Sequence, residues 1–225
     1  MYNVLLDASG EAKLGVGDMT IHSRIDPQMI SMKKDEILNA ASMIILDGNL
    51  TEEAIHCTLQ MCQESKKPLF FEPTDMKKAI KVLGLSAFIF CFKIVMCLYP
   101  YQIMTSAHFS SVTYTSPNVY ELQTMAQVEL TCDATSDLHL YLKNCVKISE
   151  NLMRSLQVIL LTLGDLGVLV IRRGSHSDPL PLENDPVCHE VAPQFSATYY
   201  PVPAFLKGGV TCVSGNVYYD FLTCP

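Results

Sequence analysis

Short apolar runs alternate with amphipathic segments along most of this chain, and a polar motif follows each of the main runs. Runs of four or five apolar residues fit buried strands of a parallel sheet. The amphipathic segments between them fit the crossover helices that parallel strands require. The alternation therefore predicts an α/β fold with a mainly parallel sheet. Ligands of such sheets collect where the strands end, which is where the polar motifs lie.

The expected strands lie at 43–46, 68–72, 112–115, 158–162 and 168–172, after a β-hairpin at 3–16 that turns at Ser9-Gly10. Helices are expected at 27–41, at 51–65, after Asp75, from Asn118, and at 137–155. Asp, Thr and Asn at these starts are the residue types that cap helices. Residues 174–203, rich in Pro, Asp, Ser and His, are expected to run over the surface.

The length of 225 residues suits a single domain, at 1–225, with a sizeable core. A net charge of -7 with only 16 Lys and Arg provides no basic surface for phosphates, so nucleic acid is excluded as a partner. Nine cysteines show no zinc spacing, and the first 30 residues contain no secretory leader. We expect reduced, buried cysteines in a cytoplasmic protein.

One segment, at 85–99, is apolar and aromatic with a single charge, Lys93. It is shorter than the roughly 20 residues that cross a bilayer, so we do not expect a membrane span, although attachment through this segment is an open alternative.

Asn118 and Glu121 permit two interpretations. Asn at a helix start with Glu three residues later forms a capping box, which alone explains both residues. A helix start after a parallel strand is also electropositive, so a carboxylate there can hold hydrated Mg²⁺ beside nucleotide phosphates. Glu121 is the candidate metal ligand.

The run Thr162-Leu163-Gly164-Asp165-Leu166-Gly167-Val168 is similarly ambiguous. Two glycines three residues apart can simply allow a tight turn between two strands. Glycine also leaves backbone amides accessible to a phosphate or an adenine ring.

With Val213-Ser214-Gly215, the order and spacing of the motifs resemble the PfkB or ribokinase family of carbohydrate kinases, and within it the pseudouridine kinases. The strings GVGDM (15–19), LDGNL (46–50), EPTD (72–75), SPN..EL (116–122) and TLG..GV (162–168) are similar to motifs of that family. The resemblance covers most of 1–83 and 110–215.

The resemblance implies a three-layer αβα sandwich that transfers the ATP γ-phosphate to a sugar hydroxyl, with pseudouridine as the parent acceptor. It implies that Asn118 and Glu121 organise Mg²⁺ and phosphates and that Thr162, Gly164 and Gly167 line the nucleotide. Gly215 would be the first glycine of the family's Gly-Ala-Gly-Asp, whose amides stabilise phosphoryl charge and whose Asp is the base. The hairpin resembles a remnant of the family's small lid.

Three departures qualify the resemblance. After Gly215 the chain continues as Asn216-Val217 in a tail at 216–225 that is not of the family type, so no catalytic residue is assigned. An apolar insert at 84–109 interrupts the pattern, and the family's opening strands with their sugar-binding residues are not found. We expect a partial kinase domain without catalytic turnover. The resemblance is also compatible with descent from a bifunctional protein in which the kinase is fused to a pseudouridine-5′-phosphate glycosidase. The alternative is a non-catalytic fragment that binds nucleotide, or pairs with another copy through an open sheet edge as a homodimer or with a full-length chain.

Overall fold

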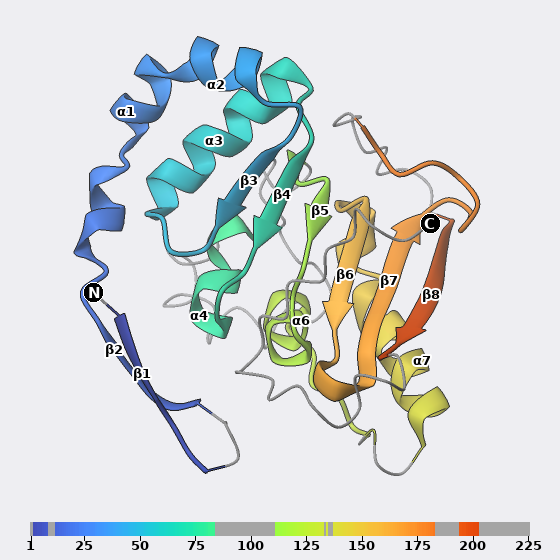
Figure 1. Ribbon diagram of the computed structural model, residues 1–225. Helices are drawn as coiled ribbons and strands as arrows, with labels where there is room; N and C mark the ends of the chain where they lie inside the picture. The colour runs from blue at the N-terminus through green and yellow to red at the C-terminus, as the bar shows by residue number, and fades with distance from the viewer. Residues whose placement is uncertain are drawn as a thin grey trace, which may run out of the picture.

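The computed structural model describes residues 2–8, 12–83, 111–132, 134, 137–182 and 194–202. An antiparallel hairpin, β1 (Tyr2–Leu6) and β2 (Ala12–Gly17), precedes a six-stranded sheet in the order β3-β4-β5-β6-β7-β8 (Figure 1). The sheet contains β3 (Ile44–Asp47), β4 (Leu69–Glu72), β5 (Tyr114–Thr115), β6 (Val158–Thr162), β7 (Gly167–Arg173) and β8 (Phe195–Pro201). Strands β3 to β6 pair in parallel, and β6 to β8 pair antiparallel, which confirms a mainly parallel α/β sheet.

Most of the α-helices begin where the sequence places capping residues. They are α1 (Pro27–Met32), α2 (Lys34–Ala40), α3 (Glu52–Ser65), α4 (Met76–Ala79), α6 (Val119–Ala126) and α7 (Leu138–Ser149), with short 3₁₀ helices η1 (Thr20–Arg24), η2 (Lys81–Leu83), η4 (Leu152–Arg154) and η5 (Gly164–Leu166). Five helices have a side-chain cap that accepts a bond from the amide three residues later: Asp26, Thr51, Asp75, Asn118 and Asp137. Each cap satisfies an amide that the helix itself leaves unpaired.

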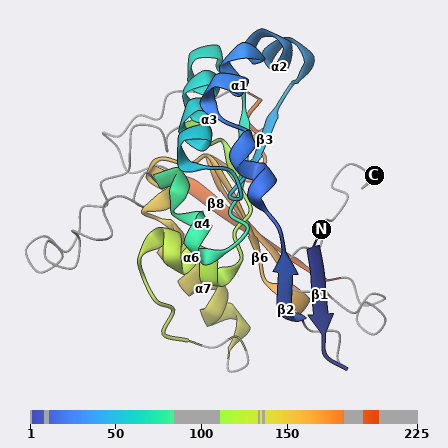
Figure 2. The same ribbon diagram turned by 90° about the vertical axis from the view of Figure 1, so that its left-hand side faces the viewer.

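The main core lies between one face of the sheet and helices α3, α4, α6 and α7, which lie on the same side in Figure 2. Leu46, Phe71 and Ile159 point into this core from three strands, and Phe71 is completely buried. Full burial of one such side chain contributes about 1.5–3 kcal/mol relative to exposure. This packing fixes where each strand ends.

The opposite face of the sheet carries the alternate residues of each strand. Cross-strand register aligns Ile45, Phe70, Tyr114, Val158 and Arg172 in one row there. Segment 175–182 is held against this face, because the Tyr114 hydroxyl donates to the Pro181 carbonyl (2.5 Å) and Arg172 Nη2 donates to the Pro179 carbonyl (2.8 Å). Ile45, on the edge strand β3, is 74% exposed.

Three details of the predicted elements are corrected. The helix expected at 27–41 is two helices that meet at Lys33, and Asp35 and Glu36 provide the acidic first turn that favours a new helix start. The helix expected to reach Ser155 ends at Ser149 and is followed by η4. Residues 195–201 are not a surface excursion, because they form β8 along the whole of β7.

Several expectations fall outside the described residues: the turn at Ser9-Gly10, the insert at 84–109, Gly215 and the tail at 216–225. Within the residues that the structure describes, no helix is long and apolar enough to cross a bilayer. Four cysteines can be described there, and all are free; Cys62 and Cys145 are buried, as expected, whereas Cys57 and Cys132 are partly exposed.

Candidate functional site

Polar side chains gather where the parallel strands end. Asp47 and Glu72 are the last residues of β3 and β4 and are direct neighbours in the sheet register. Ser116 follows β5, and Thr162 ends β6. By the alternation of each strand, all four lie on the face away from the main core. The carboxyl edge of the sheet thus presents carboxylates and hydroxyls on one side.

The first turn of helix α6 lies at this edge and contains the complete capping box. The Asn118 amide donates to Glu121 Oε2 (2.8 Å), and the Glu121 amide donates to Asn118 Oδ1 (3.0 Å). Glu121 is only 4% exposed. Burial raises the pKa of Glu121, the bond from the Asn118 amide opposes this rise, and the charges of Glu72 and Asp75 add to it. The capping interpretation is confirmed, and it places a buried carboxylate at the electropositive end of the helix.

Glu72 connects β4 to the segment that leads into α6. The Ser116 hydroxyl donates to Glu72 Oε2, and the Thr74 amide donates to Glu72 Oε1 (3.4 Å). Burial raises the pKa of Glu72; the bonds from Ser116 and Thr74 lower it, and the nearby charge of Asp47 raises it further. The edge therefore holds two carboxylates, Glu72 and Glu121, whose charged forms are both disfavoured.

Two lysines fix the loop that follows β3. Lys78 Nζ contacts Asp75 Oδ2 (2.7 Å) and Asn49 Oδ1 (2.9 Å). Lys81 Nζ donates to the carbonyls of Gly48 (2.9 Å) and Leu50 (2.7 Å), and burial together with the charge of Lys78 lowers the pKa of Lys81. Burial of Asp75 would raise the pKa of its carboxyl, but the bonds and charge of Lys78 lower it overall.

Gly48 has to be glycine, because an added Cβ would lie 2.5 Å from the Pro73 carbonyl oxygen. The loops after β3 and β4 are therefore in close contact. The contact joins the LDGNL and EPTD segments, since Gly48 lies against Pro73 and Asn49 accepts a hydrogen bond from Lys78.

The turn between β6 and β7 contains two glycines, and a different structural reason applies to each. Gly164 has φ +60°, and nothing lies within 4 Å of the position of an added Cβ. Gly167 has φ +115°, and an added Cβ would lie 2.2 Å from the Tyr200 carbonyl oxygen. Close packing against β8 accounts for Gly167, whereas Gly164 exposes its backbone to open space.

The turn adjoins helix α6. Thr162 donates its amide to the Pro117 carbonyl (2.9 Å), and its Oγ1 lies 3.4 Å from the same oxygen. Asn118 and Thr162 form an isolated parallel bridge. The structure thus brings together Asn118, Glu121 and Thr162, and Gly164 follows two residues after Thr162. Gly167 packs against β8, and Gly215 lies outside the described residues.

A cation at this edge of the sheet would have few protein ligands. Over the described ranges, no group of three or more His, Cys, Asp or Glu side chains is placed to bind a metal ion. Mg²⁺ in nucleotide sites commonly uses one or two carboxylates and completes its shell with water and phosphate oxygens. Glu121 fits that mode, and the edge does not fit a dedicated protein cage.

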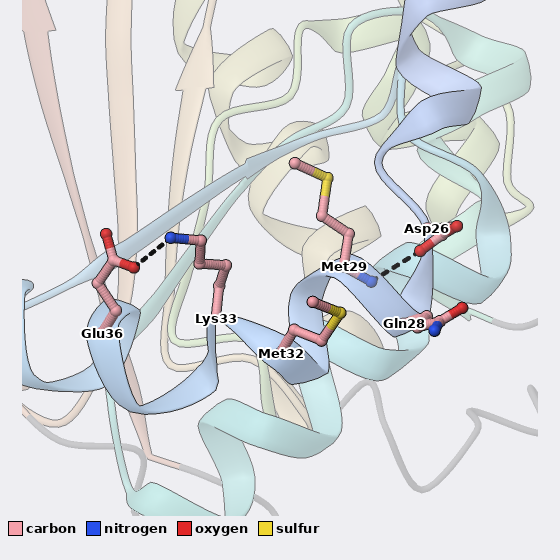
Figure 3. A pocket seen from close by; sticks show the side chains of 6 residues that line it. All are labelled: Asp26, Gln28, Met29, Met32, Lys33 and Glu36. Carbon is pink, nitrogen blue, oxygen red and sulfur yellow. Dashed lines mark hydrogen bonds and ion pairs between the residues drawn. The ribbon is translucent and has the colours of Figure 1, made fainter.

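A separate open pocket of about 450 Å³ lies at the junction of α1 and α2 (Figure 3). It is lined by Asp26, Gln28, Met29, Met32, Lys33 and Glu36, and Lys33 and Glu36 form an ion pair across 2.5 Å. None of its lining residues belongs to the carboxyl edge. Because α2 precedes the start of β3, this pocket adjoins the other end of the strands.

Sequence reasoning did not single out Glu72, Ser116, Lys78 and Lys81 as site residues. The signal for Glu72 was present, because it is a carboxylate directly after the apolar run Pro68-Leu69-Phe70-Phe71. The contacts of Ser116 with Glu72 and of the lysines with the β3 loop join segments far apart in the chain, and no local pattern indicates them.

Comparison with known proteins gives relatives in sequence and in fold. No family model matches the chain. A pseudouridine kinase from Arabidopsis thaliana is 23% identical over 195 residues, which are 80% of this chain and 44% of that protein. A pseudouridine kinase from Escherichia coli is 31% identical over 81 residues, which are 36% of this chain and 25% of that protein.

The chain is similar to kinases of the PfkB/ribokinase family. Its fold agrees, since a carbohydrate kinase from Agrobacterium tumefaciens superposes with a TM-score of 0.50 and 14% identity over 81% of this chain and 51% of that one. The chain spans less than half the length of the two pseudouridine kinases. The ribokinase-type α/β fold expected from the motifs is therefore confirmed.

Proposed function

We propose that this chain forms the nucleotide side of an ATP-dependent PfkB-type kinase, whose parent reaction transfers the ATP γ-phosphate to the 5′-hydroxyl of pseudouridine. The observation that carries the proposal is the meeting of three elements at one sheet edge: the capped amino end of α6, Thr162 at the end of β6, and the open backbone at Gly164. Helix amino ends and bare glycine backbone are the two protein features that most readily receive phosphates.

Each residue has a role in this proposal. Asn118 and Glu121 organise the phosphates and Mg²⁺ at the start of α6, and Thr162 and Gly164 contact the nucleotide. Gly167 supports the turn by allowing β8 to approach. Magnesium, when bound with the nucleotide, neutralises charge on the phosphate oxygens. The buried carboxylate of Glu121 is suited to binding a cation, because burial disfavours its charged form and an adjacent positive charge would stabilise that form.

The pseudouridine acceptor rests on the two relatives that are named pseudouridine kinases. This chain contributes no assigned base, because Asn216 and Val217 follow Gly215 where the family motif continues toward its aspartate. A positioned base contributes about 10²–10⁴-fold to rate. We therefore expect nucleotide binding without appreciable turnover from this chain alone.

Calorimetric titration of ADP or ATP with Mg²⁺ into the folded chain tests the proposal. Wild type should bind, and Glu121→Ala should bind about ten- to a hundredfold more weakly, since interactions with charged groups contribute about 1.5–3 kcal/mol. Gly164→Val should obstruct approach to the turn. Glu64→Ala, on the exposed end of α3, is the control and should bind as wild type does. Absence of binding in a folded wild-type chain would contradict the proposal.

A further inference from the structure

Glu72 is placed to hold the segment that leads into helix α6. It lies at the end of β4, 44 residues before Ser116, and its carboxylate accepts a hydrogen bond from the Ser116 hydroxyl. The Thr74 amide binds the second carboxylate oxygen at 3.4 Å. Both oxygens are thus used to connect β4 with its own loop and with the chain after β5.

From Ser116 the connection continues to β6. The carbonyl of the next residue, Pro117, accepts a hydrogen bond from the Thr162 amide (2.9 Å), and Asn118 forms a parallel β-bridge with Thr162. Asn118 then closes the capping box with Glu121. A continuous set of contacts therefore runs from β4 across the start of α6 to the end of β6, and Glu72 is its first member.

We propose that Glu72 is a positioning residue, whose bond to Ser116 fixes the first turn of helix α6, with Asn118 and Glu121, against the carboxyl edge of the sheet. The inference rests on the proposed function in taking this turn as the nucleotide side. Accurate placement matters there, because a group misplaced by about 1 Å can cost a site about a hundredfold in rate.

The energetics of Glu72 support a role other than stabilising the fold. Burial and the like charge of Asp47 disfavour its charged form, and no ion pair of Glu72 is found among the described residues. A neutral residue that accepted the same bond would avoid this cost. Groups held in such unfavourable surroundings concentrate at functional sites.

Hydrogen exchange of the full chain without ligand gives the first test. Glu72→Ala and Ser116→Ala should each speed amide exchange at the first turn of α6 and at Thr162, and the double variant should exchange no faster than either single one. Glu72→Gln retains an acceptor for Ser116 and should exchange no faster than wild type does. Glu36→Ala, an exposed residue of α2, is the control.

Titration with Mg²⁺-ADP gives the second test. Binding should weaken in Glu72→Ala and Ser116→Ala and should be restored in Glu72→Gln. Wild-type exchange in Glu72→Ala, acceleration spread evenly over the chain, or failure of Glu72→Gln to restore protection would overturn the positioning role. If no variant binds nucleotide while exchange follows the expected pattern, the proposed function is wrong and the positioning role stands.

Discussion

Alanine at the two glycines of the β6–β7 turn should have unequal effects on stability. At Gly164, φ is +60° and no atom lies within 4 Å of the new Cβ, so the cost is the strain of a left-handed residue, about 1–2 kcal/mol. At Gly167, φ +115° and ψ -140° add backbone strain of about 1–3 kcal/mol. The new Cβ would also lie 2.2 Å from the Tyr200 carbonyl oxygen, so β8 must move and lose at least one hydrogen bond, about 0.5–1.5 kcal/mol.

The sum for Gly167→Ala is about 1.5–4.5 kcal/mol, against about 1–2 kcal/mol for Gly164→Ala, so the loss at Gly167 should be the larger. Urea unfolding followed by circular dichroism measures both, and a lower midpoint at an unchanged slope reports stability. Equal midpoints, or a larger loss at Gly164, would refute the assignment of Gly167 to strand packing and of Gly164 to an open backbone. A second expected difference is functional, since only Gly164→Ala should weaken nucleotide binding in chains that remain folded.

Three further predictions follow from burial and sequence. The pKa of Glu72 is raised in the folded chain, so the contribution of Glu72 to stability is present below its unfolded pKa and is lost as pH rises through its folded pKa. Glu72→Gln should therefore be more stable than wild type at pH 7. Unfolding curves recorded below about pH 4 should show no such difference. Burial raises the pKa of both Cys62 and Cys145 to about 12, so iodoacetamide at pH 8 should label them only after unfolding, and mass spectrometry that finds rapid labelling of the native thiols would contradict their burial. Pseudouridine with ATP and Mg²⁺ should give no more phosphorylated product than a Glu121→Ala control, and sensitive product detection above that control would show that a base is supplied elsewhere in the chain.

The fold was largely predictable because its signals are local. Asp26, Thr51, Asp75, Asn118 and Asp137 are capping residue types directly before amphipathic segments, and all five cap helices. The apolar runs likewise became strands within one or two residues. In both cases a few neighbouring residues determine the local structure, and tertiary packing agrees with them.

Strand β8 was missed although its sequence contains a strand signal. Phe195, Ala197 and Tyr199 alternate with polar or exposed residues, and aromatic residues favour strands. The surrounding Pro and Asp content masked this short alternation. Pairing with β7 stabilises the strand, and such pairing depends on a partner more than 20 residues away in the chain.

Only the part of the candidate site that depends on neighbouring residues was predictable from the sequence. Asn118 and Glu121 are three residues apart and form a motif that can be read directly. The bond from Ser116 to Glu72 joins residues 44 positions apart in the chain. The reason for glycine at Gly167, close packing against β8, depends on a strand that lies far along the chain, and Gly164 has no such neighbour. Contacts of this range are determined by sheet order, which propensity does not encode.

The place where a nucleotide binds decides whether the carboxyl edge of the sheet is the nucleotide side of a kinase. Amide NMR spectra of the folded chain should be recorded during titration with Mg²⁺-ADP. The proposed nucleotide site predicts that chemical-shift changes concentrate at 116–122 and 162–167, around the first turn of α6 and the Gly164 turn. Shifts concentrated instead at 26–36, around the pocket between α1 and α2, or a spectrum that does not change at all, would contradict it.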